Sequence, residues 1–361
     1  MENYDPLYWN CKLPIEVLRI IFGNLNGKDL VNVAMVCRSW LEAAIEEKRT
    51  RLSPCCFKID DNVTDNEFLN SVKNIRIKPL ICIRFSNTDH TSHKKDPFVD
   101  ELPRHCEVIT LRDYKTYMQH SYFNAIRRQI YVFLPEIPYV KIKTFVLPNN
   151  VHKTAEYSEI ISTINNYKAS MPNEETSTCL MLFCNYLYIA KRWASAICKR
   201  KENKNLSVFG VKYNKIKLIH INNWYGRKYP WHFCRKVEES LSCIAVLIIG
   251  LMQTYSIVLE TECNTEEQIE ARLQLFKNEV KLKRHSIGFM FCGNINEKTT
   301  LQSKIFEKLF PKVLLTDNVI HDGIYRRPTS VDELNEKRNN EEEDFAFCYK
   351  TNTMFLLLTY D

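Results

Sequence analysis

The sequence predicts an α+β protein in which a small N-terminal module of three helices precedes a larger mixed α/β domain. Residues 13–53 hold apolar residues at helical spacing, separated by short polar breaks. After residue 73, alternating or continuous apolar segments typical of strands interleave with amphipathic helical segments. This interleaving indicates layers of strands and helices and argues against a bundle or a sandwich. No fixed-period repeat emerges, which disfavours a leucine-rich or propeller-type domain.

The composition is that of a globular protein. The chain has 361 residues, of which 45% are hydrophobic, so about 300 residues beyond the module can form one large or two ordinary domains. The N-terminus is acidic and polar and carries no signal-peptide pattern, so we expect the 14 cysteines to be reduced thiols. The longest apolar run, residues 243–252, is about half the length of a membrane span. We therefore expect a soluble chain of the cytosol, the nucleus or both.

The first helix of the module is predicted to begin at Pro14, which fixes φ and lacks an N–H that a first helical turn leaves unpaired. Apolar residues then recur at the spacing of one helix face; these are Val17, Leu18, Ile21, Phe22 and Leu25. The polar residues 24–28 end this helix. Asp29 is predicted to cap a second helix that carries Leu30, Val33 and Val36.

A third helix contains Trp40, Leu41, Ala44 and Ile45 and is expected to stop near Ser53 and Pro54. Three short helices cannot bury this much apolar surface among themselves, so part of it must face a partner or the rest of the chain. The predicted organisation is an N-terminal tail (1–12), the helical module (13–53), a linker (54–72) and the larger domain (73–361), with possible halves 73–240 and 241–361.

The pattern from Leu13 to Ala44, L-P-x-E-V-L-x-x-I-F-x-x-L-x-x-x-D-L followed by V-C-R-x-W-x-x-x-A, resembles the F-box. This resemblance implies a substrate-recognition subunit of an SCF-type cullin-RING E3 ubiquitin ligase, which binds a Skp-type adaptor through the module and a target protein through the domain behind it. It also implies that the chain is no enzyme, because ligase chemistry resides in other subunits. The residues expected to bind the adaptor are Leu13, Pro14, Ile15, Leu18, Ile21, Phe22, Leu25, Leu30, Val36, Cys37 and Trp40. The alternative is that Leu18, Phe22 and Trp40 are ordinary core residues of a helical subdomain.

The larger domain is predicted to contain many strands and a few clear helices. The expected helices are 158–168, 187–201, 265–282 and 298–309, the third opening with a Thr265–Gln268 capping box. The expected strands are 73–85, 106–111, 130–134, 141–147, 178–183, 206–211, 217–221, 242–251, 255–260, 286–292 and 354–360. The charged segment 331–344 is predicted to be a solvated loop or insertion between two final strands.

The strand Ile287-Gly288-Phe289-Met290-Phe291 and the helix that ends at Phe310-Pro311 resemble the C-terminal half of the FIST domain. The stretches 72–79 and 133–142 are similar to its N-terminal half. This resemblance implies a FIST-like domain, and a FIST-type small-ligand-sensing domain with an accessory F-box is the alternative function. Family members carry Gly-rich turns where only Gly293 and Gly323 remain here, and the loss of glycine argues against ligand sensing.

Motifs for other chemistry are missing from the sequence. There is no Gly-rich phosphate-binding loop, no C-x-x-C pair and no G-x-S-x-G nucleophile elbow. The pair His90 and His93 lacks partners at zinc-finger spacing. We therefore expect no cofactor, metal or catalytic site and no membrane partner.

A basic cluster at residues 191–217 contains nine Lys/Arg against one Asp/Glu. With Trp193, Tyr213 and Trp224 it could contact nucleic-acid phosphates and stack bases. The positive end of a helix followed by an exposed strand face explains the same residues, and we favour this account because the formal net charge is only +7. Recruitment of an acidic substrate surface is an intermediate interpretation.

Overall fold

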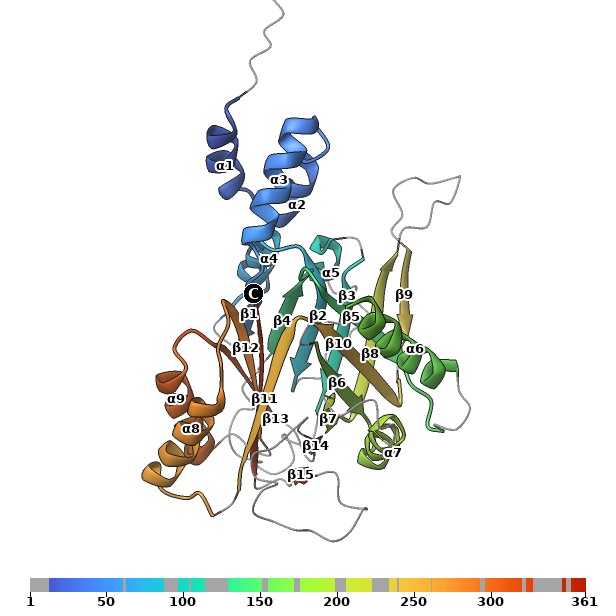
Figure 1. Cartoon of the computed structure of the whole chain (residues 1–361), viewed down its shortest axis with the longest axis vertical. Coiled ribbons are helices and arrows are strands. Elements are labelled where there is room, and N and C mark those ends of the chain that lie inside the picture. Colours follow the sequence, from blue (N-terminus) through green and yellow to red (C-terminus); the bar gives the residue numbers. More distant parts are fainter. Residues whose placement is uncertain are drawn as a thin grey trace, which may run out of the picture.

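The predicted fold class is confirmed, because a helical N-terminal region precedes a larger sheet-rich domain (Figure 1). The computed structural model describes residues 13–60, 63–87, 97–103, 105–113, 129–150, 155–171, 176–198, 206–222, 234–238, 240–260, 262–292, 296–319, 323–326, 346–348 and 352–361. The histidines at 90 and 93, the charged segment 331–344 and Gly293 lie outside these residues.

The module consists of the three predicted helices: α1 (Ile15–Gly23), α2 (Gly27–Val33) and α3 (Arg38–Thr50). Helix α1 begins at Ile15, one residue later than predicted, and Pro14 stands at its N-cap. The predicted cap of α2 is wrong. Asn26 is the capping residue, and its side chain accepts a hydrogen bond of 2.8 Å from the backbone N–H of Asp29. Asp29 sits within the first turn instead, where its charge favours the positive helix end.

The segment 54–72 is not a plain linker. It contains β1 (Cys55–Ile59) and most of α4 (Asp65–Lys73), which opens with a capping box formed by Thr64 and Glu67. The sequence did not reveal β1 because five residues with only partial burial give little periodic signal. The larger domain therefore begins directly after α3.

In the described part of the larger domain, the strands form three sheets. The first has the order β1, β4 (Gln129–Pro135), β2 (Pro79–Ser86), β3 (Glu107–Arg112), β8 (Lys215–Asn222) and β9 (Cys234–Glu238). The second has the order β15 (Ala346–Cys348), β14 (Gly323–Arg326), β7 (Leu206–Lys212), β6 (Ser177–Cys184), β10 (Cys243–Gly250) and β5 (Val140–Val146). The third has the order β11 (Met252–Leu259), β16 (Thr353–Tyr360), β12 (His285–Cys292) and β13 (Leu314–Val319).

The same supersecondary unit builds each sheet. Each unit has four strands. The last strand lies between the first and the second and pairs antiparallel with both, and the second strand also pairs parallel with the third. Strands β1, β2, β3 and β4 follow this plan in residues 55–135, and β5, β6, β7 and β10 follow it in residues 140–250. Strands β11, β12, β13 and β16 repeat it in residues 252–360. The two predicted halves are thus replaced by three units.

Two hairpins each extend the sheet of the preceding unit and so join the units. The second unit contributes β8 and β9, and β8 pairs antiparallel with β3 of the first unit. The third unit contributes β14 and β15, and β14 pairs antiparallel with β7 of the second unit. Each of these hairpins extends a sheet across a unit boundary through backbone hydrogen bonds.

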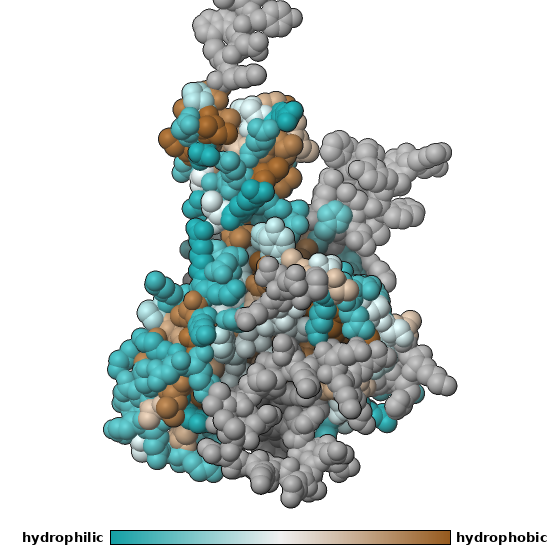
Figure 2. Space-filling view, viewed as in Figure 1, coloured by the Kyte–Doolittle hydropathy of each residue, from teal (hydrophilic) through white to brown (hydrophobic). Residues whose placement is uncertain are grey.

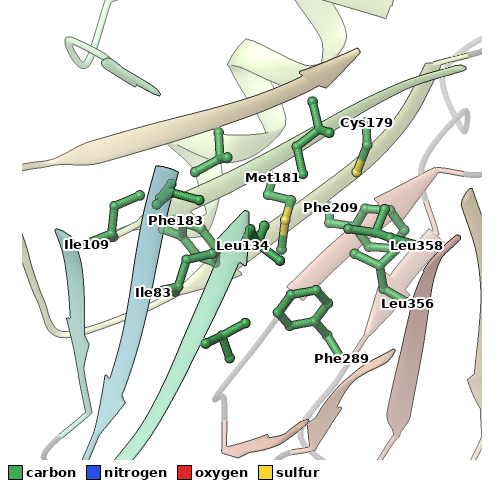
Figure 3. Close-up of a cluster of buried hydrophobic side chains, with 14 of the residues drawn as sticks. Ile83, Ile109, Leu134, Cys179, Met181, Phe183, Phe209, Phe289, Leu356 and Leu358 are labelled. Carbon is green, nitrogen blue, oxygen red and sulfur yellow. The ribbon is translucent and has the colours of Figure 1, made fainter. Parts of the chain in front are cut away.

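The inner faces of the three sheets share one hydrophobic core (Figure 3). Ile83 and Leu134 of the first sheet, Met181 and Phe209 of the second and Phe289 of the third belong to this cluster. The outer face of each sheet is covered by two helices. These are α4 and α5 (Pro97–Glu101), α6 (Ala155–Ser170) and α7 (Leu187–Cys198), and α8 (Glu266–Glu279) and α9 (Glu297–Leu309).

The four predicted helices of the larger domain are confirmed as α6, α7, α8 and α9, including the Thr265–Gln268 capping box; residues 199–201 lie outside the described part. All eleven predicted strands overlap strands of the structure, but the segment 73–85 matches β2 only from Pro79 on, because its first residues belong to the end of α4 and a turn. Sequence reasoning missed α4, α5 and strands β1, β9, β13, β14 and β15. The missed strands are short or sheet-edge segments that lack a long apolar run.

The expectation that every cysteine is reduced is corrected at one place. Cys184 of β6 and Cys243 of β10 face each other across the second sheet and form a disulfide. Nine further cysteines of the described part form no disulfide. Burial raises the pKa of the Cys82 thiol well above its ordinary value and that of Cys55 to about 12. Such thiols stay protonated and act as small hydrophobic side chains.

The segment that leaves α3 is tied to the third sheet. Ser53 Oγ lies 2.9 Å from His285 Nδ1, and the Tyr360 hydroxyl donates a 2.9 Å hydrogen bond to the Leu52 carbonyl. Burial, followed by the charge of Arg284, lowers the pKa of His285. The neutral imidazole is therefore the form that the fold favours.

We predict that acidification weakens this contact. Because the pKa of His285 is lower in the folded chain than in the unfolded chain, its contribution to stability is present above the unfolded value and is lost as the pH falls towards the folded value. His285→Asn should therefore reduce the difference between urea midpoints measured at pH 7.5 and pH 5.5. His105→Asn, at an exposed histidine, is the control and should leave that difference unchanged.

Candidate functional site: the N-terminal docking surface

The helical module has a small core of its own. Leu18, Phe22 and Leu30 are buried in it together with Ala43 and Ala44. The rings of Phe22 and Trp40 meet edge to face, with centroids 5.4 Å apart and an interplanar angle of 71°. This contact joins α1 to α3 and is a favoured aromatic geometry.

The structure divides the residues predicted to bind the adaptor into three groups. Leu13, Pro14, Ile21, Val36 and Cys37 are exposed, and Ile15, Leu25 and Trp40 are half-buried. Leu18, Phe22 and Leu30 retain only 1%, 0% and 5% of their exposed surface, so these three are core residues of the module. Their contact with an adaptor stays a prediction, because in this chain their surface is used for packing the module's own core.

Exposed apolar side chains that the sequence did not single out for adaptor binding complete the surface. Ile20 is 69% exposed and Met35 is 75% exposed; Val17, Val31, Leu41 and Ile45 are also exposed. Figure 2 shows brown, hydrophobic side chains gathered on α1 and along the neighbouring α2 and α3. We call these residues, with Leu13, Ile21 and Val36, the docking surface. The sequence could have indicated these residues, because an apolar side chain outside the buried face of its helix is expected to be exposed.

Ion pairs accompany the docking surface. Arg19 of α1 donates to Glu46 of α3 over 2.6 Å, and Arg38 pairs with Glu42 within α3 over 3.1 Å. The hydrogen bond from Arg19 to Glu46 raises the pKa of the guanidinium. Exposed pairs of this kind add little stability.

Arg51 connects the module to the larger domain. Its buried guanidinium donates hydrogen bonds to the carbonyls of Phe22 (2.5 Å), Leu25 (2.7 Å) and Arg76 (2.9 Å). It also pairs with the Glu47 carboxylate over 2.7 Å. Phe22 lies in the last turn of α1 and Leu25 lies just beyond its end, where the helix carries partial negative charge. One side chain thus caps α1 and holds it to the segment that enters β2.

Gly27 allows the closest approach at this junction. Its N–H donates a 2.7 Å hydrogen bond to the Ile75 carbonyl. A Cβ at this position would lie 2.2 Å from the Ile77 carbonyl oxygen, so no larger residue fits without displacement. Arg76 adds a 2.6 Å hydrogen bond to the Gly23 carbonyl.

A carboxylate reinforces the same junction from the larger domain. Lys48 of α3 donates a 2.7 Å hydrogen bond to Glu136, and Lys78 lies 3.7 Å from it. The hydrogen bond from Lys48, together with the two positive charges, lowers the pKa of Glu136 below its ordinary value. The module is therefore fixed to the larger domain by buried hydrogen bonds and a surface ion-pair cluster.

The basic cluster does not assemble a nucleic-acid site from its predicted aromatics. Trp193 is fully buried, and its indole N–H donates a 2.9 Å hydrogen bond to the Pro148 carbonyl. Tyr213 is buried in the shared core, and Trp224 lies outside the described residues. Neither described ring can stack on a base.

The described residues contain no group of three or more His, Cys, Asp or Glu that could hold a metal ion. None of the helices in this part of the chain is both long and apolar enough to cross a membrane.

Comparison with known proteins identifies the module. Residues 10–50 match the family model described as F-box-like. A search of the curated proteins gives no match. The chain therefore carries an F-box-like domain, which spans the three helices of the docking surface and supports an adaptor-binding role.

Loss of the Arg51 guanidinium should weaken the junction. Arg51→Met keeps the apolar stem but leaves the Glu47 carboxylate and three carbonyls without their main donor, at a cost of about 3 kcal/mol in the free energy of unfolding. Arg38→Met removes an exposed pair on the same helix and should leave that free energy unchanged within error. Chemical denaturation of both variants tests this; equal stabilities would refute the role of Arg51.

A methyl group at Gly27 should separate α2 from the larger domain. Gly27→Ala places its Cβ against backbone, which cannot move aside cheaply, so the melting temperature should fall by several degrees. Gly23→Ala is the matched control, because a Cβ there meets nothing within 4 Å and alanine favours helix. The prediction fails if the two variants melt at the same temperature.

Proposed function

We propose that this protein is a substrate-recognition subunit of an SCF-type cullin-RING E3 ubiquitin ligase. In this proposal the docking surface binds a Skp-type adaptor and the larger domain holds a target protein. The chain itself performs no catalysis, and cullin and RING subunits reach it through the adaptor. It acts in the cytoplasm, the nucleus or both.

The observation that carries the proposal is the docking surface within the F-box-like match. Ile20, Met35 and their neighbours expose large apolar side chains on a module whose core is already complete. Contiguous exposed apolar residues mark interaction sites. Because Leu18, Phe22 and Leu30 form the core beneath, their role is to keep the three helices in a shape that fits the adaptor.

The fixed junction supports the same function. A receptor for ubiquitination must hold its target at a set position relative to the adaptor, and Arg51, Gly27 and Glu136 remove freedom between the two parts of this chain. Figure 1 shows the module projecting from the sheets, so the docking surface stands clear of the larger domain.

We also propose that the larger domain is FIST-like and that the chain is similar to F-box only protein twenty-two. The support is the sequence order of the Gly-Phe-Met-Phe strand, which forms β12, and the helix ending at Phe310, which forms α9. Holding a protein target is favoured over sensing a small ligand because the Gly-rich turns are reduced to Gly293 and Gly323.

Adaptor affinity tests the proposal. Ile20→Glu and Met35→Glu place a charge on exposed positions of the docking surface without disturbing the core, so each should weaken binding of the full chain to a purified Skp-type adaptor by about tenfold or more. Leu275→Glu, on the exposed face of α8, is the control and should bind as the natural chain does. Biolayer interferometry measures all of them. Equal affinity of all variants, or no binding by the natural chain, would contradict the proposal.

A further inference from the structure

A groove of about 600 Å³ lies where the end of α3 meets the β4–β5 turn and the start of β5. We call it the junction groove. Its lining includes Lys48 and Arg49 of α3, Tyr139 and Lys141 near the turn, and Tyr167 of α6. A smaller apolar hollow beside α2 shares Ile45, Lys48 and Glu136 with it. The junction groove therefore adjoins the contact between the module and the larger domain.

Tyr139 is held rigidly beside this groove. Its φ is 57°, in the left-handed region that a bulky aromatic residue rarely adopts, yet its side chain is 66% exposed. Its carbonyl accepts hydrogen bonds from the Leu251 N–H (3.0 Å) and from the Tyr167 hydroxyl. A Cβ at Gly250 would lie 2.1 Å from that carbonyl oxygen, so glycine is required there for the turn to fit.

These constraints fix the backbone of Tyr139 in an unfavourable conformation and leave its aromatic side chain at the surface. Backbone strain persists only where the surrounding structure imposes it, and it concentrates at binding and catalytic sites. Neither the core nor a sheet needs the exposed ring of Tyr139. A tyrosine side chain has only two χ angles, so it loses little conformational entropy on binding and is a favoured anchor for a partner.

The charge of the groove is positive. Glu136 is the one carboxylate among the lining residues, and Lys48 and Lys78 already balance it. Arg49 and Lys141 are exposed cations, and neither makes an ion pair with a residue in the described part of the chain. They therefore leave two positive charges beside the Tyr139 ring.

The remaining lining residues are apolar. Ile45 is exposed and also belongs to the docking surface, while Leu80 and Ile142 are half-buried. An occupant should then carry carboxylates for Arg49 and Lys141 and an apolar side chain for the Tyr139 ring. A nucleic acid fits less well, because phosphate backbones are bound by longer runs of cations than the two available here.

We propose that the junction groove binds an acidic segment of the target protein, with carboxylates at Arg49 and Lys141 and an apolar side chain against Tyr139. This inference rests on the proposed function and specifies its substrate class. The groove adjoins the module, so a segment bound there lies next to the adaptor side of the molecule. Complementary charge gives such a site selectivity for acidic partners.

The test uses the full chain and a fluorescein-labelled peptide, Gly-Asp-Glu-Leu-Asp-Glu-Phe-Gly, in a fluorescence anisotropy titration. Its amide counterpart, Gly-Asn-Gln-Leu-Asn-Gln-Phe-Gly, should bind at least about tenfold more weakly. The double variant Arg49→Glu/Lys141→Glu should weaken binding of the acidic peptide by about tenfold or more. Lys304→Glu/Lys312→Glu changes the net charge equally at exposed sites outside the groove and should leave binding within about twofold.

The Tyr139→Gly variant separates the aromatic ring from the backbone. Glycine adopts the left-handed conformation freely, so this variant keeps the fold and should weaken peptide binding by about threefold or more. Unchanged melting temperatures show that each variant is folded.

Three results would overturn the proposal. They are the absence of acidic-peptide binding at about 1 mM, equal binding of the amide peptide, and equal losses in the two charge-reversal variants. Tighter binding of a labelled twelve-residue oligothymidine that is abolished by Arg49→Glu/Lys141→Glu would assign the groove to nucleic acid instead. Adaptor affinity, measured on the same samples, reports separately on the proposed function, because Arg49 and Lys141 lie outside the docking surface.

Discussion

The hydrogen bonds of Arg51 are the interaction on which the arrangement of this molecule depends. A buried guanidinium is costly unless its donors find acceptors, and here three carbonyls and one carboxylate accept four hydrogen bonds. One of those carbonyls lies in the last turn of α1, one lies just beyond it and the third precedes β2. Because one planar group must satisfy both sides at once, the module has a single orientation on the larger domain. A flexible lysine could not impose this geometry, since its ammonium lacks the rigid fork of arginine.

The larger domain is a well-packed framework to which the module is attached. Three copies of one strand-and-helix unit place their inner faces on a common core, and each outer face is covered by its own pair of helices. The β8–β9 and β14–β15 hairpins make the sheets continuous across the unit boundaries. The chain leaving α3 is bound to this framework through Ser53 and His285 of the third sheet. A displacement of the module would therefore have to break contacts with the first and third sheets together.

Helix α3 joins the two surfaces proposed to bind partners. Leu41 and Ile45 contribute to the docking surface, whereas Lys48 and Arg49, one turn further, line the junction groove. One helix thus contributes to both surfaces. The junction groove adjoins the docking surface, and strain at Tyr139 and unpaired cations meet there.

The sequence by itself determined the three helices of the module, the four long helices of the larger domain and most of its central strands, because hydrophobic periodicity is a local property of the chain. It also determined the F-box-like pattern. It did not separate core from surface within that pattern, since Leu18 and Ile21 are equally apolar and only packing against Trp40 and α3 buries one and exposes the other. The threefold repetition of the unit and the hairpins that join the units were likewise decided by tertiary structure, because strand pairing joins residues far apart in sequence. The same holds for Arg51 and Tyr139. Their contacts are with backbone groups that are distant in sequence, so the residues next to them along the chain do not predict these roles.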